Sequence, residues 1–172
     1  MPVCLRPIVR HPKLKLALAA LLCVPLMNAS HAATATSTFT VQMTVTSSCV
    51  INSTSTLDFG TTGVLTANVD STSTLAIQCT NTTPYNIGLD AGLGTGATVA
   101  VRKLTNGTKL INYSLYTTSA RTTVWGNTVG TDTVAGTGNG ASQNYTVYGR
   151  VPAQTTPAPA AYTDTITVTV TY

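Results

Sequence analysis

Side chains able to carry out chemistry are scarce in this sequence of 172 residues. Its two histidines, His11 and His31, both fall within the first 32 residues. Glutamate is absent, so an acid–base pair has to come from five scattered aspartates that show no motif spacing. The serines lack the G-x-S-x-G context of an activated nucleophile. These features argue against an enzyme, and the shortage of His and free Cys ligands argues against a metal or other cofactor.

Cys49 and Cys79 are the reactive side chains that remain after the first 32 residues are set aside. Two cysteines in an exported chain most often form a disulfide. Closing a loop of about 30 residues contributes roughly 3–4 kcal/mol on the chain-entropy model. We therefore expect a Cys49–Cys79 disulfide, and the alternative is a pair of buried free thiols.

The first 32 residues have the pattern of a secretory signal peptide. Basic residues precede an apolar run from Leu16 to Met27, and Ser30 and Ala32 suit cleavage before Ala33. This run is shorter than the ~20 residues that a membrane-spanning helix needs. No later apolar stretch has that length, so we expect an exported protein that is not an integral membrane protein.

The net charge of +4 comes entirely from four basic residues of the leader, which are Arg6, Arg10, Lys13 and Lys15. The rest of the chain balances five basic residues against five aspartates. No basic patch of the kind that binds phosphate backbones is present, so nucleic acid is not an expected partner. Threonine is the commonest residue, and its branched side chain favours strands.

Apolar and polar residues alternate with a period of two in several short segments, which indicates strands with one buried face. Asn106–Gly107 predicts a hairpin turn, and Asp58 is expected to anchor a turn. Asp164 is expected to begin the last strand on its solvent face. Trp125 and the tyrosines are expected in the core or at sheet edges, with a sugar-binding face as the alternative. The expected strands are 38–46, 49–51, 73–79, 84–90, 97–104, 109–117, 143–151 and 162–172, which together predict an all-β sandwich.

The first and last of these strands are unusual. In residues 38–46, Phe39, Val41, Met43 and Val45 alternate with polar residues, although chain termini fray unless something holds them. The last strand runs to the final residue, so nothing follows that could pair with its outer edge. Its shared face consists of Ile166, Val168, Val170 and Tyr172.

The order and spacing of several short motifs resemble the spore coat protein U domain family, which also makes the subunits of archaic, Csu-type chaperone–usher pili. These motifs are Cys49–Val50, LDFG (57–60), IQC (77–79), INYSLY (111–116), WG (125–126), TVYGR (146–150) and YTDTITVTVTY (162–172). The resemblance implies an incomplete immunoglobulin-like β-sandwich that lacks its last strand. A periplasmic chaperone fills the resulting groove first, and the N-terminal strand of a neighbouring subunit replaces it at the outer-membrane usher, which is donor-strand complementation.

After the signal peptide (1–32), which the residue pattern predicts, the resemblance implies a donor-strand extension (33–48) and a pilin-like domain (49–172). The side chains of Phe39, Val41, Met43 and Val45 become the inserted face, and Ile166, Val168, Val170 and Tyr172 become candidates for the acceptor groove. The alternative is that residues 38–46 form the first strand of their own domain. One domain with a donor candidate suggests a shaft or adaptor subunit, because tip subunits of this type have two domains.

The expected function is that of a structural subunit of a surface pilus, exported through the periplasm to the cell surface, where it supports adhesion and biofilm formation. Its expected partners are neighbouring pilus subunits, the chaperone and the usher. The alternative is a secreted binding module, such as a lectin-like adhesin or a spore-coat component.

Overall fold

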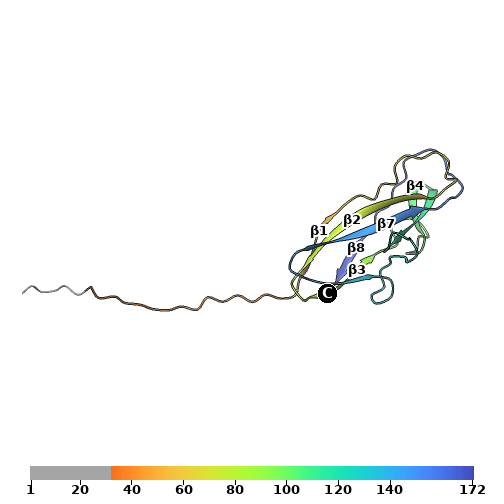
Figure 1. Cartoon of the computed structure of the whole chain (residues 1–172). Helices are drawn as coiled ribbons and strands as arrows, with labels where there is room; N and C mark the ends of the chain where they lie inside the picture. Colours follow the sequence, from red (N-terminus) through yellow and green to blue (C-terminus); the bar gives the residue numbers. More distant parts are fainter. Residues whose placement is uncertain (1–31) are drawn as a thin grey trace, which may run out of the picture. The chain divides into compact units, whose positions relative to one another are not determined.

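The computed structural model of the chain describes residues 32–172 (Figure 1). The expected signal peptide lies outside the described residues, apart from Ala32. The chain divides into two units after Gln42, and the second unit, Met43–Tyr172, contains every described strand. In the described part of the first unit, residues 32–42 are exposed and form no helix or strand. Across residues 32–172, no helix is long and apolar enough to cross a membrane.

The second unit is built from two antiparallel sheets, so the all-β expectation is confirmed. The larger sheet has the order β1-β2-β7-β5-β4, and the smaller has the order β6-β3-β8. The strands are β1 (Cys49–Thr54), β2 (Val69–Cys79), β3 (Pro84–Leu89), β4 (Arg102–Asn106), β5 (Lys109–Tyr116), β6 (Val134–Thr137), β7 (Ser142–Val151) and β8 (Val168–Thr171).

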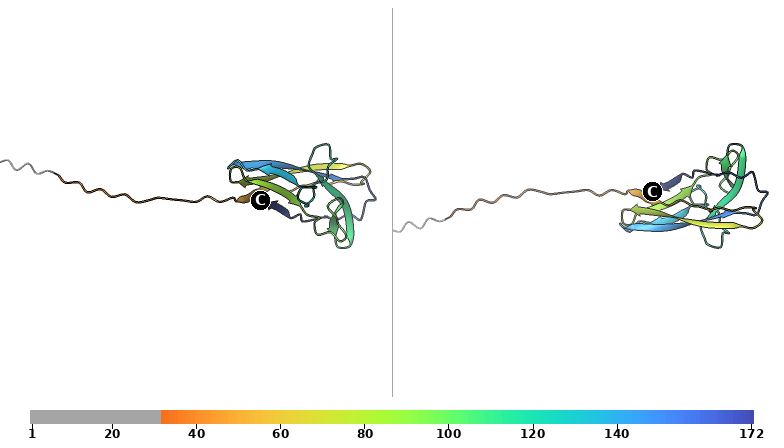
Figure 2. Two further views of the ribbon diagram at one scale, coloured as in Figure 1. Left: turned by 90° about the horizontal axis from the view of Figure 1, so that it is seen from below. Right: turned by 90° about the horizontal axis from the view of Figure 1, so that it is seen from above.

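One hydrophobic core lies between the two sheets, which form separate layers in Figure 2. In β2, Leu75 and Ile77 are buried while the intervening residues are exposed or half-buried, because successive side chains of a strand point to opposite faces. The β3 residues Ile87 and Leu89 meet them from the smaller sheet. Trp125 is fully enclosed, and its indole N–H donates to the carbonyl of Ile87 over 2.8 Å.

The Cys49–Cys79 disulfide is present, as expected. It joins the first residue of β1 to the last residue of β2, and the two cysteines are direct partners in the ladder. Because β1 pairs with β2 alone, the disulfide fastens an edge strand to the sheet at one end.

Several strand boundaries differ from the expectation, and one strand is additional. β1 extends to Thr54 instead of ending at residue 51, and β2 begins at Val69 instead of residue 73. β4 begins at Arg102 instead of residue 97, because the backbone before it forms turns, in which the Ala97 N–H donates to the Gly94 carbonyl and the Thr98 N–H to the Val101 carbonyl. The Arg102 side chain is buried and donates to backbone carbonyls of neighbouring segments. β6 was not expected, because its VAGT sequence has a weak pattern. The last strand begins at Val168 instead of residue 162, because the preceding segment has only isolated pairings, such as Thr105 with Thr163.

Candidate functional site

Each sheet has two edge strands, β1 and β4 in the larger sheet and β6 and β8 in the smaller one, and of these β1 and β8 lie near one another. β1 pairs only with β2, and β8 pairs only with β3, so each has a backbone edge without a ladder in the described chain. An unpaired edge presents a row of free N–H and C=O groups, which can pair with an added strand. The two strands approach one another on the same side of the sandwich.

A cavity of about 390 Å³, lined by both apolar and polar residues, opens between the segments that adjoin these two strands, and it is named the edge groove below. One wall is formed by Thr54 at the end of β1 and by residues 55–57 and Phe59 after it. The other wall is residues 164–168, which lead into β8. Its floor includes the buried side chains of Leu75 and Leu115. The groove therefore exposes part of the hydrophobic core at the side where neither sheet continues.

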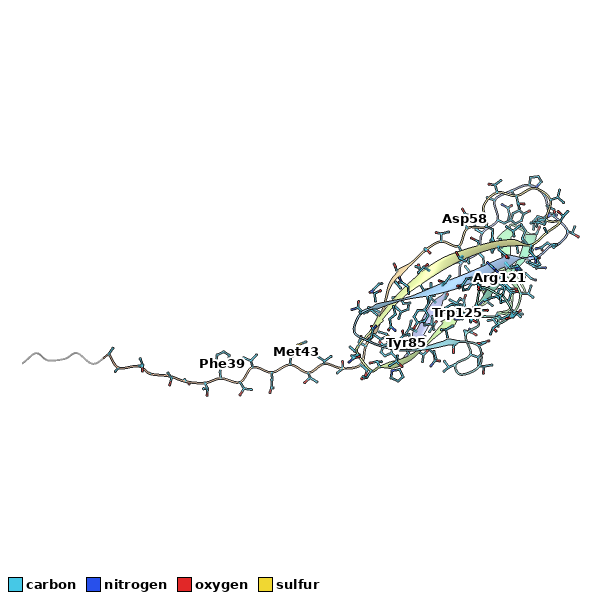
Figure 3. All side chains as sticks on the ribbon, in the orientation of Figure 1. Phe39, Met43, Asp58, Tyr85, Arg121 and Trp125 are labelled. Atoms are coloured by element: carbon cyan, nitrogen blue, oxygen red, sulfur yellow. A yellow bond between two sulfur atoms is a disulfide. The ribbon has the colours of Figure 1, made fainter. Side chains whose placement is uncertain are left out.

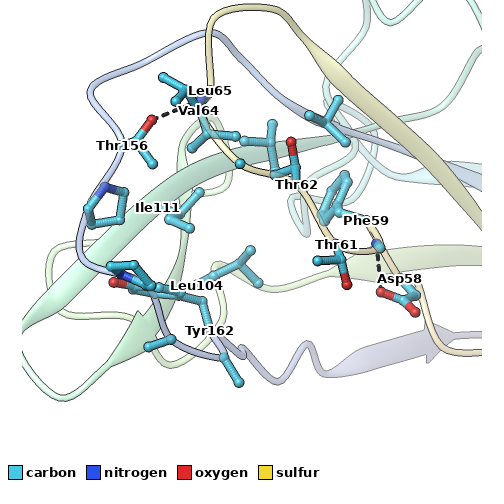
Figure 4. A pocket seen from close by; sticks show the side chains of 18 of the residues that line it. Asp58, Phe59, Thr61, Thr62, Val64, Leu65, Leu104, Ile111, Thr156 and Tyr162 are labelled. Atoms are coloured by element: carbon cyan, nitrogen blue, oxygen red, sulfur yellow. Dashed lines mark hydrogen bonds between the residues drawn. The ribbon is translucent and has the colours of Figure 1, made fainter.

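A second cavity, of about 810 Å³, adjoins the edge groove and shares Leu57, Phe59 and Leu104 with it. Figure 4 shows this cavity, which lies between the loop of residues 58–65 and the Pro/Ala-rich loop of residues 156–162. A hydrogen bond of 2.8 Å from the Leu65 N–H to the Thr156 hydroxyl holds the two loops together. The apolar lining thus continues from the edge groove to the loop end of the domain.

In the segment 164–172, apolar and polar side chains point to opposite faces, as the alternating sequence predicts. Ile166, Val168 and Val170 are half-buried and pack against the core, while the threonines between them are exposed. Of the four groove candidates, Ile166 and Val168 line the edge groove. Val170 packs on the core outside its lining, and Tyr172 is 59% exposed.

The prediction for Asp164 is wrong, because this residue does not face solvent. It is half-buried on the same face as Ile166 and lines the edge groove. Its Oδ2 accepts the Tyr113 hydroxyl over 2.7 Å, and its Oδ1 accepts the N–H of Leu93 over 2.8 Å. Burial, assisted by this hydrogen bond, raises the pKa of Tyr113. Side chains of a strand alternate between its two faces, so residues 164, 166 and 168 point to the same side. This spacing, read from the sequence, is enough to predict that Asp164 points inward with Ile166.

Asp90 is a second carboxylate at the same wall, and its position was not anticipated. Its Oδ1 accepts the N–H of Thr167 over 2.9 Å and that of Gly92 over 3.0 Å. Burial acts to raise the pKa of Asp90, but the hydrogen bonds from Thr167 and Gly92 outweigh burial and lower it. Asp90 and Asp164 together fix the segment that forms this wall.

The N-terminal segment of residues 38–46 exposes its apolar residues. Phe39, Val41, Met43 and Val45 are between 72% and 88% exposed, and Figure 3 shows Phe39 and Met43 on the extended chain. Between residues 32 and 48 the structure assigns no strand. Four large apolar side chains at alternate positions therefore have no protein surface covering them in the described chain.

Other candidate residues have structural roles. Asp58 accepts the N–H of Gly60 over 2.8 Å, which confirms the expected turn, and Gly60 has a positive φ of 72°. Trp125 is 1% exposed, so it belongs to the core and to no sugar-binding face. Within residues 32–172, no three His, Cys, Asp or Glu side chains gather as metal ligands would. Of these features, the edge groove and the exposed N-terminal segment suit the binding of another polypeptide.

An all-β domain with two free strand edges beside an apolar groove is typical of proteins that bind an added strand. The family model described as "Spore Coat Protein U domain" matches residues 35–169, and the chain belongs to this family. Protein U of Myxococcus xanthus is 34% identical over 158 residues, which cover 83% of this chain and 88% of that protein. The resemblance seen in the sequence is therefore confirmed.

A solved structure is also similar: the chaperone–tip adhesion subunit pre-assembly complex CsuC–CsuE, from archaic chaperone–usher Csu pili of Acinetobacter baumannii. The match has a TM-score of 0.53 and 26% identity over 75% of this chain. This chain spans 40% of the matched chain. The pilus-like fold and the disulfide indicate a location outside the cytoplasm.

Proposed function

We propose that this protein is a structural subunit of a chaperone–usher surface pilus that polymerises by donor-strand exchange. On this proposal, the domain is an immunoglobulin-like sandwich without its last strand, and residues 38–46 of a second copy supply that strand. One observation carries the proposal. The chain has both a groove that opens onto the hydrophobic core beside two unpaired edge strands and an exposed segment with alternating apolar side chains.

The free energy of burial supports insertion of this segment. Removing Phe39, Val41, Met43 and Val45 from water contributes roughly 1.5–3 kcal/mol for each side chain, before the cost of ordering the segment. A ladder of backbone hydrogen bonds with β8 stabilises the complex further and removes an exposed edge. The same bonds explain how one groove accepts first a chaperone strand and then a subunit strand, because backbone pairing requires no particular sequence.

The arrangement of strand ends supports a linear polymer. β1 begins where β8 ends, because Cys49 pairs with Cys79 at the end of β2, and Asn86, near the start of β3, pairs with Thr171. A donor segment running antiparallel to β8 leaves the groove at the opposite end, near Asp164. Its own domain then follows at that end, so successive copies are joined head to tail and the fibre does not close into a ring.

The partners and location follow from this function. The chaperone protects the groove in the periplasm, the usher exchanges the strands at the outer membrane, and the fibre supports adhesion and biofilm formation at the cell surface. The chaperone-bound pilus subunit to which the fold is similar supports this assignment. The donor candidate within residues 33–48 favours a shaft or adaptor position over the tip.

The proposal is tested by deleting residues 34–46 and comparing cold and boiled samples in detergent gels. The full-length chain, extracted from cells that also express the neighbouring genes, should give a ladder that collapses to one band on boiling, because strand-exchanged polymers are kinetically stable. The deletion should abolish the ladder but leave chaperone binding intact. Normal polymers from the deletion variant would refute the proposal.

A matched pair of single substitutions provides the control. Val41→Asp places a charge on the apolar face of the donor and should abolish the ladder. Thr40→Asp places the same charge on the opposite face, where it remains in water, and should leave the ladder in place. If both variants lose the ladder equally, the added charge acts on export in general and not on the apolar face of the donor.

A spore-coat component is the second candidate, favoured by the family description and by the similarity to Protein U. It predicts a monomer that needs no chaperone. A single monomer band in both cold and boiled samples, with the neighbouring genes expressed, would favour this candidate over the pilus.

A further inference from the structure

We propose that the donor segment docks against the final segment, residues 164–172, in one fixed register, which Asp164 determines at one end of that segment and Tyr172 at the other. This inference rests on the proposed function, because it requires residues 38–47 of a second copy to lie along residues 164–172, beside and beyond the edge groove. In this register the donor residues and their partners are Ser47 with Asp164, Val45 with Ile166, Met43 with Val168, Val41 with Val170 and Phe39 with Tyr172.

The two alternations restrict the choice of register. Directly opposed residues of antiparallel strands point to the same face of a sheet, so a shift by one residue would turn every apolar donor residue outward. Only shifts of two residues keep both apolar faces in the groove. Three registers follow, in which Val45 lies opposite Asp164, Ile166 or Val168.

The hydrogen bonding of Asp164 excludes the first of these three. Its Oδ1 already accepts the N–H groups of Leu93 and Thr165, while its Oδ2 accepts only the Tyr113 hydroxyl. A carboxylate oxygen accepts about two hydrogen bonds, so Oδ2 retains one free acceptor position. Val45 at this position would remove that oxygen from water without replacing the lost hydrogen bond. Ser47 at this position donates its hydroxyl to it.

The opposite end of the groove excludes the third register. With Val45 opposite Val168, Val41 instead of Phe39 faces Tyr172, so no aromatic pair forms at this end. The same shift places the hydroxyl of Ser47 opposite Ile166, within the apolar lining. In the proposed register Phe39 instead covers the ring of Tyr172, which is 59% exposed. A pair of aromatic rings at this end stabilises the complex beyond simple burial.

Cysteine pairs on the outward face test the register without changing the apolar contacts. Gln42→Cys with Thr169→Cys places both cysteines directly opposite one another in the proposed register. Thr40→Cys with Thr169→Cys reports the register with Val45 opposite Asp164, and Thr44→Cys with Thr169→Cys reports the one with Val45 opposite Val168. Residues displaced by two positions lie beyond the Cα separation that a disulfide spans. Each variant keeps the native Cys49 and Cys79.

Polymers of each double variant are oxidised, boiled and run without reducing agent. A ladder that survives boiling only for the 42/169 pair is the expected result. A surviving ladder from the 40/169 or 44/169 pair would overturn the register and leave the proposed function standing. No heat-sensitive ladder from any variant or from the unsubstituted chain would instead overturn the proposed function, and this inference with it.

The role of Ser47 is tested by Ser47→Val, with Ser48→Val as the matched control. Both valines fit a strand, but only Ser47 faces Asp164 in the proposed register. Ser47→Val polymers should dissociate at a lower temperature than the unsubstituted polymers, while Ser48→Val polymers should match them. Equal dissociation temperatures in all three would overturn the pairing of Ser47 with Asp164.

Discussion

Two segments at the ends of the described chain have the same alternating pattern but different environments. In the final segment, residues 164–172, Ile166, Val168 and Val170 are half-buried against the core. In residues 38–46, the corresponding apolar side chains are at least 72% exposed. Residues 168–171 of the final segment pair with β3, whereas no strand is assigned between residues 32 and 48. An alternating pattern therefore specifies which face of a strand is apolar, but it does not specify what covers that face.

The largest expected change in the free energy of unfolding comes from removing the Cys49–Cys79 disulfide, which lies where the N-terminal segment joins the larger sheet. Replacing both Cys49 and Cys79 by serine should lower the free energy of unfolding by about 2–5 kcal/mol, because the disulfide restricts the unfolded chain. Urea unfolding of the double variant and the unsubstituted chain measures this difference. A change below about 1 kcal/mol would show that the ladder alone holds β1 in place.

An aspartate placed in each of the two segments tests the comparison directly. Val168→Asp should lower the free energy of unfolding by about 2–3 kcal/mol, because it introduces a charge beside the core. Val41→Asp should change it by less than about 0.5 kcal/mol, because the valine is exposed. Urea unfolding of dilute, refolded chains compares the two. Equal destabilisation would contradict the difference between the segments.

Asp90 tests how the final segment is held. Asp90→Ala should cost about 1–2 kcal/mol at neutral pH, because the Thr167 N–H loses its carboxylate partner. The pKa of Asp90 is lowered in the folded state, so its contribution is complete above its ordinary value of 3.8 and is lost as the pH falls through the lowered pKa. The difference between the variant and the unsubstituted chain, followed by urea unfolding against pH, should therefore shrink in acid. A difference that is constant down to pH 2 would contradict this assignment.

A small effect is also expected on the outer face of the larger sheet, away from the groove. Asp70 accepts two hydrogen bonds from Arg150, at 2.7 and 2.8 Å, and lies 3.3 Å from Arg121. The Arg150 hydrogen bond is the main cause that lowers the pKa of Asp70. Because this cluster is in contact with water, Asp70→Asn should cost less than about 1 kcal/mol, and added salt should reduce the cost. Thermal unfolding at low and high salt measures it.

Much of the fold could be predicted from the sequence because alternation, turn residues and cysteine pairing are local signals. The strands around Ile77, Ile87 and Leu115 were identified in this way, as was the disulfide. The buried position of Arg102 could not be predicted, because it depends on carbonyls from distant segments that only the folded chain brings together. The inward orientation of Asp164 follows from its position two residues before Ile166, because alternate residues of a strand share a face. Its charge suggests the opposite, a side chain in water, and that expectation is wrong.

The edge groove itself could be anticipated only through the free edge of the last strand. Its walls come from segments more than 100 residues apart, and its floor comes from the larger sheet. The wall formed by Leu57 and Phe59 was not identified, because LDFG was interpreted as a turn. The sequence thus indicated that one edge is open, and the folded chain shows which side chains border the opening.

The position of the disulfide has a mechanical consequence. A pulling force along the N-terminal segment enters the domain at Cys49, which is bonded covalently to Cys79. The load therefore passes at once from the edge strand β1 to β2, which is paired along ten residues with β7. A hydrogen-bonded ladder is weakest when one strand is pulled away from its end. The Cys49–Cys79 disulfide prevents β1 from being peeled off β2 in this way. Under tension, reducing conditions should convert a domain that resists shear into one that unzips from its first strand.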